Sequence, residues 1–493
     1  MNLRIPFTSK TLNFSYDAVA STKRRNAPRQ TIHSEDYELR AASRKKLVAT
    51  ALDQQRNFAI VGWMVRKHLD YVSRFTFNSQ TGVDEIDERL EYLWLEWAGR
   101  RTCDIARRHN LNRIMRLFES GKVLDGDCGI LEVQGGYLQG VEGNRIARPN
   151  DSTDEKISEH GLVLDAYGAV DKYCVCKRDD QTNLLVLDRM VPYNEMVFDG
   201  YFTRFDQTRG VSPLAAAINT FQDLYETLDY QLLKAKFHAM FGVFIARKGD
   251  DVQGSGFGEK DSNTGAAPTA ATTKYDFELK PGLKLEGAPG DSLSTIESHT
   301  PSSEFQAFTE LEIQIALLAL DIPLSFFNSI KANFSGRKMD MVEYELAATS
   351  KREANQESLY EIAEWRIPQI VATDADLSSA IRAAGLTVDT LKYDFQPQTA
   401  PWIDEAAEVN AIISKVGAGL SSLTHEAKKK GRDIRDIARE RGAELKLFDE
   451  EDVPLTIGQP GQNRTAATDT PSNDQKPIDN EVTNASESEM VPD

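Results

Sequence analysis

One long helical pattern, residues 212–241, limits the possible folds of this chain more than any other feature. Ser212 can cap the free N–H groups of a helix start, and Pro213 suits the first helical position because it has no N–H to satisfy. A single apolar stripe follows at helical spacing: Leu214, Ala217, Ile218, Phe221, Leu224, Tyr225, Leu228, Leu232 and Ala235. At 1.5 Å per residue, this helix spans roughly 40 Å.

A second helix is predicted over residues 302–321, ending at Asp321-Ile322-Pro323. Its buried face is expected to consist of Phe305, Phe308, Leu311, Ile315 and Leu318. Between the two helices, residues 242–249 and 274–289 are typical of strands, and the Gly-, Ser- and Thr-rich stretch between them is typical of a mobile loop. Two helices that flank a small β module can pack antiparallel and present that module at one end.

The remaining pattern is mainly helical with a block of strands. Helices are predicted from Ala41 onward, and the chain changes to short apolar runs separated by Gly, Asp and Asn over 128–148 and 161–200. A long helix is expected from Arg337 to Trp365, stopping before Pro368, followed by a linker and by two or three amphipathic helices over 403–448. The fold class predicted is therefore α+β, mainly helical.

Composition is that of a globular protein, with 493 residues, of which 40% are hydrophobic and 27% charged. The length suggests two to four domains. The sequence contains no run of 18 apolar residues and no apolar core of a signal peptide near the start, so we expect neither a transmembrane helix nor secretion. The four cysteines are too few and too badly spaced for a disulfide framework or a zinc site, which fits a reducing compartment.

The net charge of -18 is distributed unevenly along the chain. Residues 1–50 carry a net charge of +6, residues 455–493 a net charge of -5, and the segment between them a net charge of -19. A strongly acidic body disfavours tight DNA binding by counterion release, although a surface that meets DNA while repelling it remains compatible. The basic residues at the start predict a flexible arm (1–40), which is either solvated or binds nucleic acid.

No catalytic constellation stands out. The Gly254, Gly256, Gly258 and Lys260 cluster lacks the spacing and the following Ser or Thr of a phosphate-binding loop. Cys174 and Cys176 are expected to be small core side chains, and the Asp125-Gly-Asp127 sequence fits a turn as well as a metal site. The histidines are scattered, without a metal or triad pattern. We therefore predict no enzymatic activity, no cofactor and no metal.

Three motifs follow one another along the chain. Arg204, Gln207, Arg209, Gly210 and Leu214 form an R-x-x-Q-x-R-G-x-x-x-L pattern, and Asn333, Phe334, Ser335 and Arg337 form a second group. Residues 401–433 contain Asp404, the sequence Ala418-Gly-Leu-Ser421 and the sequence Gly431-Arg-Asp433. In this order they resemble the RxxQxRGxxxL, N-Y-S-S-x-R and D-P-x-K…A-G-L-S-T…G-x-D motifs of lambda-type tailed-bacteriophage portal proteins. The second motif has Phe334 in place of Tyr and one residue fewer before Arg, and the third lacks the Pro and Lys after Asp404.

The resemblance implies a portal fold in which about twelve subunits form a ring at one vertex of the virion capsid. It assigns 41–211 to the wing, 212–241 and 302–321 to an antiparallel stem, and 242–301 to the clip. Residues 322–336 become the tunnel loop, 337–400 the long wing helix and linker, 401–454 the helical crown, and 455–493 a disordered acidic tail. The ring would let double-stranded DNA pass without sequence specificity and would dock the terminase large subunit, then the head–tail adaptor. Major capsid and scaffold proteins are further implied partners, with the host cytoplasm as the site of assembly.

The tunnel loop supplies the candidate residues for contact with DNA: Phe326, Phe327, Ile330, Lys331, Asn333, Phe334 and Arg337. The apolar side chains of this loop (Phe326, Phe327, Ile330 and Phe334) could touch the duplex without base readout, or they could pack between subunits. Lys331 and Arg337 could contact phosphates. Ring interfaces could involve aromatic residues that could equally be internal core: Tyr92, Trp94, Trp97, Tyr344, Tyr360 and Trp365.

Two other functions compete with this interpretation. A packaging ATPase or nuclease would need a Walker lysine or a carboxylate cluster, neither of which the motif search finds. A monomeric DNA-binding virion adaptor would bind DNA through its basic arm and would lose that salt-sensitive affinity when residues 1–35 are deleted.

Overall fold

The computed structural model describes residues 3–4, 11–12, 33–150, 152–240, 244–247, 291–294, 303–328, 333–398 and 405–451. The chain divides into a large unit, Met1–Ile434, and a small one, Arg435–Asp493. The described part of the small unit lies in helix α13 (Ile434–Glu450). Among the described residues, no helix has the length and apolarity needed to cross a membrane.

The first part of the large unit is helical, as the sequence predicts. It contains α2 (Ala41–Asn57), α3 (Ala59–Val72), α4 (Asp84–Gly99) and α5 (Leu111–Asp125), with strand β3 (Phe75–Ser79) between α3 and α4. The extended backbone of Phe58 separates α2 from α3, which explains the break in the apolar pattern.

The described residues of the predicted arm include regular structure. Leu3–Arg4 (β1) pairs with Thr11–Leu12 (β2), and Glu35–Glu38 forms a short helix, α1. Asp36 accepts hydrogen bonds from the backbone N–H and the hydroxyl of Thr208, which ties α1 to the body. Residues Glu35–Glu38, predicted to belong to a flexible arm, therefore form a helix attached to the body.

The predicted strands form two antiparallel sheets. In the first, β4 (Asp127–Val133) lies between β5 (Tyr137–Glu142) and β9 (Met196–Gly200). In the second, β7 (Val170–Arg178) lies between β6 (Leu162–Leu164) and β8 (Leu185–Pro192). Cys174 and Cys176 are fully buried beside Ile157, which confirms that they are core side chains.

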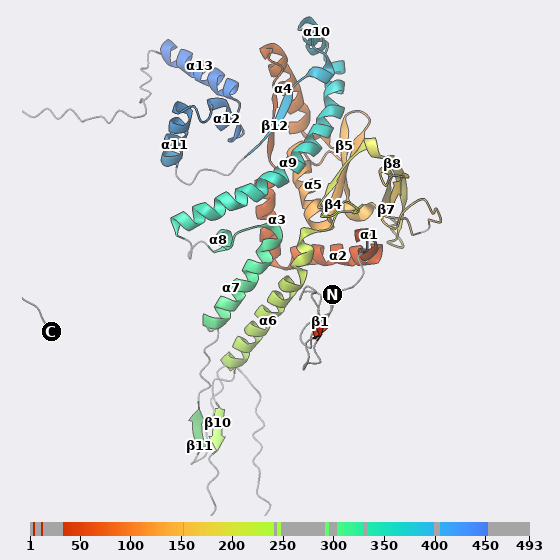
Figure 1. The fold of residues 1–493 in the computed structure, drawn as a ribbon, viewed down its shortest axis with the longest axis vertical. Helices are drawn as coiled ribbons and strands as arrows, with labels where there is room; N and C mark the ends of the chain where they lie inside the picture. Colours follow the sequence, from red (N-terminus) through yellow and green to blue (C-terminus); the bar gives the residue numbers. More distant parts are fainter. Residues whose placement is uncertain are drawn as a thin grey trace, which may run out of the picture. The chain divides into compact units, whose positions relative to one another are not determined.

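The two long helices of the sequence pattern lie side by side and run in opposite directions (Figure 1). The first begins with a 3₁₀ turn, Pro213–Ala216, in which Ser212 caps the N–H of Leu214, and continues as α6 (Ile218–Met240). The second is α7 (Ser303–Leu317), followed by a 3₁₀ turn, Leu318–Leu320. Strands β10 (Phe244–Arg247) and β11 (Asp291–Ser294) pair between them, whereas the predicted strand 274–289 lies outside the described residues.

The buried face of α7 differs from the predicted one. Ile313, Ala316 and Leu317 are buried, whereas the predicted core residues are about half exposed: Phe308 51%, Leu311 52%, Ile315 49% and Leu318 64%. The stripe of α6 behaves similarly, because Phe221 and Leu224 are buried but Tyr225 and Leu232 are more than half exposed. Both helices thus bury one end in the body and leave apolar surface along the rest.

The long helix, α9, extends beyond both of its predicted ends. It runs from Phe334 to Thr373, so it begins within the predicted tunnel loop and continues through Pro368. Ile367, Ile370 and Val371 are buried on either side of the proline. Their packing offsets the hydrogen bond that proline cannot donate, which is why the helix does not stop there. After α10 (Ala375–Ala383), strand β12 (Tyr393–Pro397) pairs with β3, where the sequence predicts a linker.

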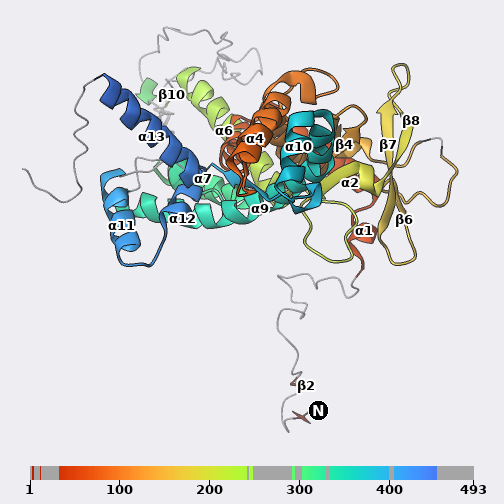
Figure 2. The same ribbon diagram turned by 90° about the horizontal axis from the view of Figure 1, so that it is seen from above.

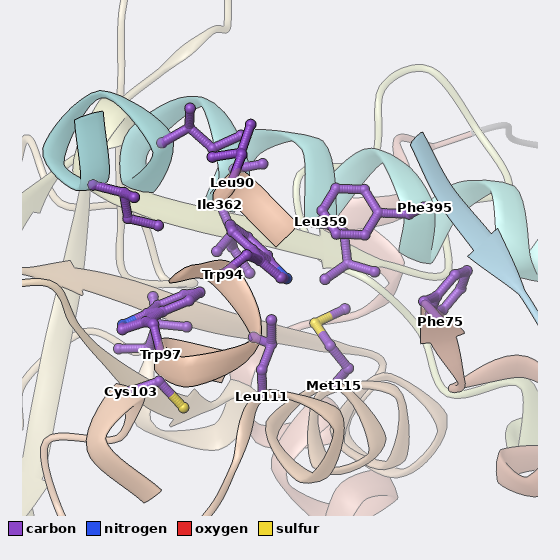
Figure 3. Close-up of a cluster of buried hydrophobic side chains, with 14 of the residues drawn as sticks. Phe75, Leu90, Trp94, Trp97, Cys103, Leu111, Met115, Leu359, Ile362 and Phe395 are labelled. Atoms are coloured by element: carbon purple, nitrogen blue, oxygen red, sulfur yellow. The ribbon is translucent and has the colours of Figure 1, made fainter. Parts of the chain in front are cut away.

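The largest hydrophobic core lies between α4, α5, α9 and the β3–β12 pair (Figure 3). Trp94 stacks on Phe77 with ring centroids 4.6 Å apart, and Leu359 and Ile362 of α9 pack in the same cluster. A second core joins α2 and α3 to the start of α6 and to the end of α7 through Phe221, Leu317 and other residues.

The remaining helices agree with the predicted C-terminal helical segment. They are α11 (Glu405–Gly417), α12 (Leu423–Lys428) and α13. Residues 455–493, the predicted disordered tail, lie outside the described residues.

Candidate functional site: the motif network and the channel segment

Arg209, from the first sequence motif, is buried and holds three parts of the chain together. Its Nε and Nη2 donate to Oδ2 and Oδ1 of Asp127, both at 2.7 Å. The same guanidinium also donates to the backbone carbonyls of Ile146, His160 and Gly143. Arg209 therefore joins the strand β4, the segment after β5 and the segment that leads into α6.

Asp127 receives a second cation. Nη2 of Arg44, on α2, donates to Asp127 Oδ1 at 2.8 Å. Burial by itself would raise the pKa of Asp127, but the charges of Arg209 and Arg44 and the hydrogen bonds to the carboxylate lower it below its usual value. The carboxylate is thus ionised inside the protein.

The other motif residues shape the backbone around this pair. The N–H of Gly210 donates to Asp127 Oδ2 at 2.8 Å, and a Cβ on Gly210 would lie 2.1 Å from the carbonyl oxygen of Gly126. Gln207 Nε2 donates to the Arg209 carbonyl at 2.7 Å, while Gln207 Oε1 accepts from the N–H of Thr203. The motif therefore specifies a close turn that leads into α6.

The segment expected to face DNA is partly helical. Pro323 precedes a short helix, α8 (Leu324–Phe327), so the predicted 322–336 loop is not irregular throughout. The ring of Phe326 lies 5.2 Å from that of Tyr344 and 5.8 Å from that of Tyr71, between centroids. Phe327 is 42% exposed, and its ring meets Trp63 edge-on. Phe326 thus anchors α8 to the body of its own chain, and Phe327 is the more accessible of the two.

The residues of the second motif lie at the start of α9. The Asn333 side chain caps the helix by accepting from the N–H of Gly336 at 2.7 Å. Ser335 and Arg337 are exposed in the first turn. The backbone of Phe334 is helical, and Ile330 and Lys331 lie outside the described residues.

Two cations on α9 connect this helix to the segment before α8 and to α3. Lys351 Nζ lies 2.8 Å from Oδ2 of Asp321, three residues before α8. Arg352 forms a two-pronged ion pair with Glu345 and donates to the carbonyl of Tyr71, the penultimate residue of α3. These contacts join the segment before α8 to α9, and α9 to α3.

A second buried polar network was not apparent from the sequence. His68 Nε2 and the Tyr201 hydroxyl each lie 2.7 Å from Glu119 Oε1, and Lys122 Nζ lies 2.9 Å from Glu119 Oε2. Burial lowers the pKa of His68, which is therefore neutral, whereas Lys122, His68 and Tyr201 together overcome burial and lower the pKa of Glu119. Lys122 also donates to Asn355 on α9 at 2.8 Å, so the network joins α5 to the long helix.

These carboxylates and histidines do not form a metal site. Within the described ranges, no three His, Cys, Asp or Glu side chains are grouped so that they could hold a metal ion. Gly126 has a φ of +96°, so the sequence Asp125-Gly-Asp127 is the turn that the alternative interpretation predicted. No residue pattern in the sequence identified Asp127 as the partner of Arg209.

The aromatic candidates for a ring interface fall into two groups. Trp94, Trp97 and Tyr344 are buried in the core, and Tyr360 and Trp365 pack partly buried against it. Only Tyr92 of these six is mainly exposed, at 57%. The interpretation of the buried residues as internal core is therefore confirmed.

Comparison with known proteins places the chain in a family. The model for "Phage portal protein, lambda family" matches residues 22–351, more than half of the chain. The chain therefore belongs to the lambda family of phage portal proteins, and its role is that of a portal, the head–tail connector of a phage-like particle. No curated protein matches it in sequence.

Similar solved structures come from gene transfer agent (GTA) particles, and the similarity is distant. A chain in "Virion of native gene transfer agent (GTA) particle" is 14% identical with a TM-score of 0.44, covering 79% of this chain and 93% of that chain. Chains in the neck of an empty particle, computed with C6 symmetry, and of a native particle, computed with C12 symmetry, are also 14% identical. Their TM-scores are 0.48 and 0.42, and each comparison covers 78% of this chain and 93% of that chain.

Proposed function

We propose that about twelve copies of this chain form a closed ring at one vertex of the capsid, with a central channel for DNA. The observation that supports this most directly is the apolar surface left open on α6 and α7. On α7 and the 3₁₀ turn that follows it, exposed apolar residues are spaced by three or four: Phe308, Leu311, Ile315 and Leu318. Contiguous exposed apolar surface marks an interaction site, and a ring requires each subunit to offer a face that its neighbour covers.

The proposed channel lets the duplex pass without holding it. The net charge of -18 repels DNA. Salt limits this repulsion to about the Debye length, which is about 8 Å at physiological ionic strength. Phe327, Asn333 and Arg337, together with Ile330, Lys331 and Phe334, are the proposed contacts of the tunnel segment. An aromatic ring and a single cation at the tip would touch the duplex without reading bases, so movement along the axis is not blocked. Phe326 supports the segment from within the chain.

The segment between the stem helices is proposed to act as the clip that docks the terminase and later the head–tail adaptor. The wing and crown are proposed to meet capsid and scaffold proteins during assembly in the host cytoplasm. The protein is proposed to act as a channel and assembly hub without catalysis of its own.

Ring formation can be tested by charge substitution on the exposed stripe. Leu311→Asp places a carboxylate in the proposed subunit interface, whereas Gln306→Asp places one on a different face of the same helix, at another exposed position. Native mass spectrometry and negative-stain images of the full chain should show closed rings for the wild type and Gln306→Asp. The Leu311→Asp variant should give mainly monomers with an unchanged far-UV circular dichroism spectrum.

The opposite results would contradict the proposal. Rings of the same mass in Leu311→Asp would show that α7 does not form the interface. A wild-type chain that stays monomeric under all salt and concentration conditions, and binds DNA only while residues 1–35 are present, would instead support a monomeric adaptor.

A further inference from the structure

A cavity of about 330 Å³ opens between the start of α2, the segment 144–150 that follows β5, and the second sheet. Both ribbon views place β7 and β8 beside α2 (Figures 1 and 2). Cavities of this size are typical of sites that receive a small molecule or a few side chains of a partner. None of the residues that line it belongs to the tunnel segment or to the stem interface proposed above.

The start of α2 gives the cavity a positive end. Ala41 and Ala42, the first two residues of the helix, line it. The residue before them, Arg40, makes no side-chain cap, and the first turn contains no acidic residue. The first backbone N–H groups of α2 are thus left without the usual carboxylate or hydroxyl partner, and the helix dipole adds partial positive charge.

Arg44 supplies a second, independent indication of an anion. Its side chain lines the cavity and is 7% exposed, and its Nε is a buried donor without a partner in the described part of the chain. Buried donors are normally satisfied, so this N–H requires a partner that the described residues do not provide. Burial, followed by the charge of Arg209, lowers the pKa of Arg44 to about 10, and an added anion would oppose both effects.

Three further cations surround the opening, in a protein whose overall charge is strongly negative. Lys45, Arg148 and Arg178 line the cavity together with a single carboxylate, Glu159. Lys45 and Arg178 are exposed, and Arg148 is partly buried with one N–H donated to the carbonyl of Ile157. The cavity therefore concentrates positive charge where the rest of the molecule would repel an anion.

The walls of the cavity are largely aliphatic. They include Val48, Ala49 and Leu52 from α2, with Ile146, Ala147 and Leu185 opposite them. A phosphate or a nucleic-acid backbone would leave this apolar surface uncovered. A carboxylate next to an aliphatic side chain would satisfy both the cations and the walls.

We propose that this cavity binds an acidic peptide segment of a partner protein, taking one carboxylate against Arg44 and the start of α2 and an adjacent aliphatic side chain against Val48 and Leu185. The site is separate from the channel and does not depend on ring formation. It gives the wing a place to bind an acidic protein segment.

Binding can be measured by fluorescence anisotropy with a labelled, C-terminally amidated hexapeptide of alternating Glu and Leu, added to the full-length protein. Ala49→Glu and Lys45→Gln should each weaken binding by at least about fivefold, since the first adds a competing carboxylate and the second removes a cation. Asn57→Glu and Lys46→Gln make the same kinds of change at exposed α2 positions that do not line the cavity, and should bind within about twofold of the wild type.

Three comparisons would overturn the proposal. Equal binding by Ala49→Glu and Asn57→Glu would place the peptide elsewhere. Equal binding of a peptide with Ser in place of Leu would remove the role of the aliphatic walls, and displacement of the peptide by equimolar inorganic phosphate would make this a phosphate site. An absence of any binding to the wild type would also refute it. Matching thermal unfolding midpoints in all four variants show that folding is unaffected.

Discussion

Arg209 and Asp127 form a two-pronged ion pair across 82 positions of sequence, with both N–O distances at 2.7 Å and neither side chain more than 1% exposed. The pair connects the motif that precedes α6 to the first residue of β4. Because Arg44 of α2 bonds to the same carboxylate, α2, β4 and the segment before α6 meet at one buried charge. The motif thus fixes the start of the α6 segment against α2 and β4.

Removing Arg209 should therefore destabilise the fold strongly. Arg209→Met leaves the buried Asp127 with one cation instead of two and leaves three carbonyls without their donor. The expected loss is about 3–5 kcal/mol of unfolding free energy, typical of breaking a buried ion pair from one side. Chemical denaturation followed by circular dichroism measures it, and Arg189→Met, at a mainly exposed arginine, is the control. A loss below about 1 kcal/mol would show that the pair is not structural.

Gly210 should tolerate no side chain. A Cβ there would lie 2.1 Å from the carbonyl oxygen of Gly126, which is backbone and cannot rotate away. Gly210→Ala is expected to cost about 1–3 kcal/mol or more, as overpacking does in a rigid site. Gly140→Ala is the matched control because a Cβ on Gly140 has no neighbour within 4 Å. Equal unfolding midpoints for the two variants would contradict the close approach.

The helices and strands and the Arg209 motif could be predicted from the sequence. The residues that contact them from distant parts of the chain, or from another copy, could not. Helical and strand periodicity predicted α2 to α7 and the two sheets because local spacing reports which faces are apolar. The stripe of Leu311 and Ile315 was predicted to be buried, yet it is half exposed in one chain. Periodicity identifies an apolar face without saying whether the same chain or another copy covers it.

The same limit applies to residues that are distant in sequence. Arg209 was recognised through its motif, but Asp127, its partner, looked like an ordinary turn residue. Nothing local predicts that β12 pairs with β3 or that α9 continues through Pro368, because both depend on packing between segments far apart.

Replacing Pro368 should stabilise the protein. Pro368 lies inside α9 and is exposed, so Pro368→Ala restores a backbone hydrogen bond without changing the core. The unfolding free energy should rise by up to about 3 kcal/mol, the cost of proline in a helix interior relative to alanine. The control is Glu364→Ala, one turn earlier on the exposed side. A lower midpoint in Pro368→Ala would mean that the helix needs the proline at this position.

Glu132 should make stability depend on pH near neutrality. Burial, followed by the charges of Glu361 and Glu195, raises the pKa of Glu132 to about 7. Since the folded state binds the proton more tightly than the unfolded state, stability is greatest below about pH 4.5 and falls as pH rises to about 7. Glu132→Gln should remove this fall and be about 1–2 kcal/mol more stable than the wild type at pH 8, after allowance for solvent screening. Unfolding at pH 5 and pH 8 measures the difference, and a wild-type and variant that change in parallel would contradict the assignment.

Phe326 and Phe327 should separate the folding role of α8 from its proposed role in the channel. Phe326 contacts Tyr71 and Tyr344, so Phe326→Ala should cost about 1–3 kcal/mol, less than a fully buried phenylalanine. Phe327 is 42% exposed, so Phe327→Ala should lower the unfolding free energy by about 1 kcal/mol or less and leave the proposed ring of subunits intact.

The distinction matters because a change in DNA retention can come from either cause. If Phe327 contacts the duplex in the channel, particles assembled with Phe327→Ala should lose packaged DNA or eject it at an altered rate, while the purified protein unfolds at nearly the wild-type temperature. Altered retention in Phe326→Ala alone, accompanied by a lower unfolding temperature, would assign the effect to the displacement of α8. Asp321, three residues before α8, pairs with Lys351 of α9, so such a displacement would be transmitted to α9. Lys351→Met should therefore reproduce the effect while leaving both phenylalanine side chains in place.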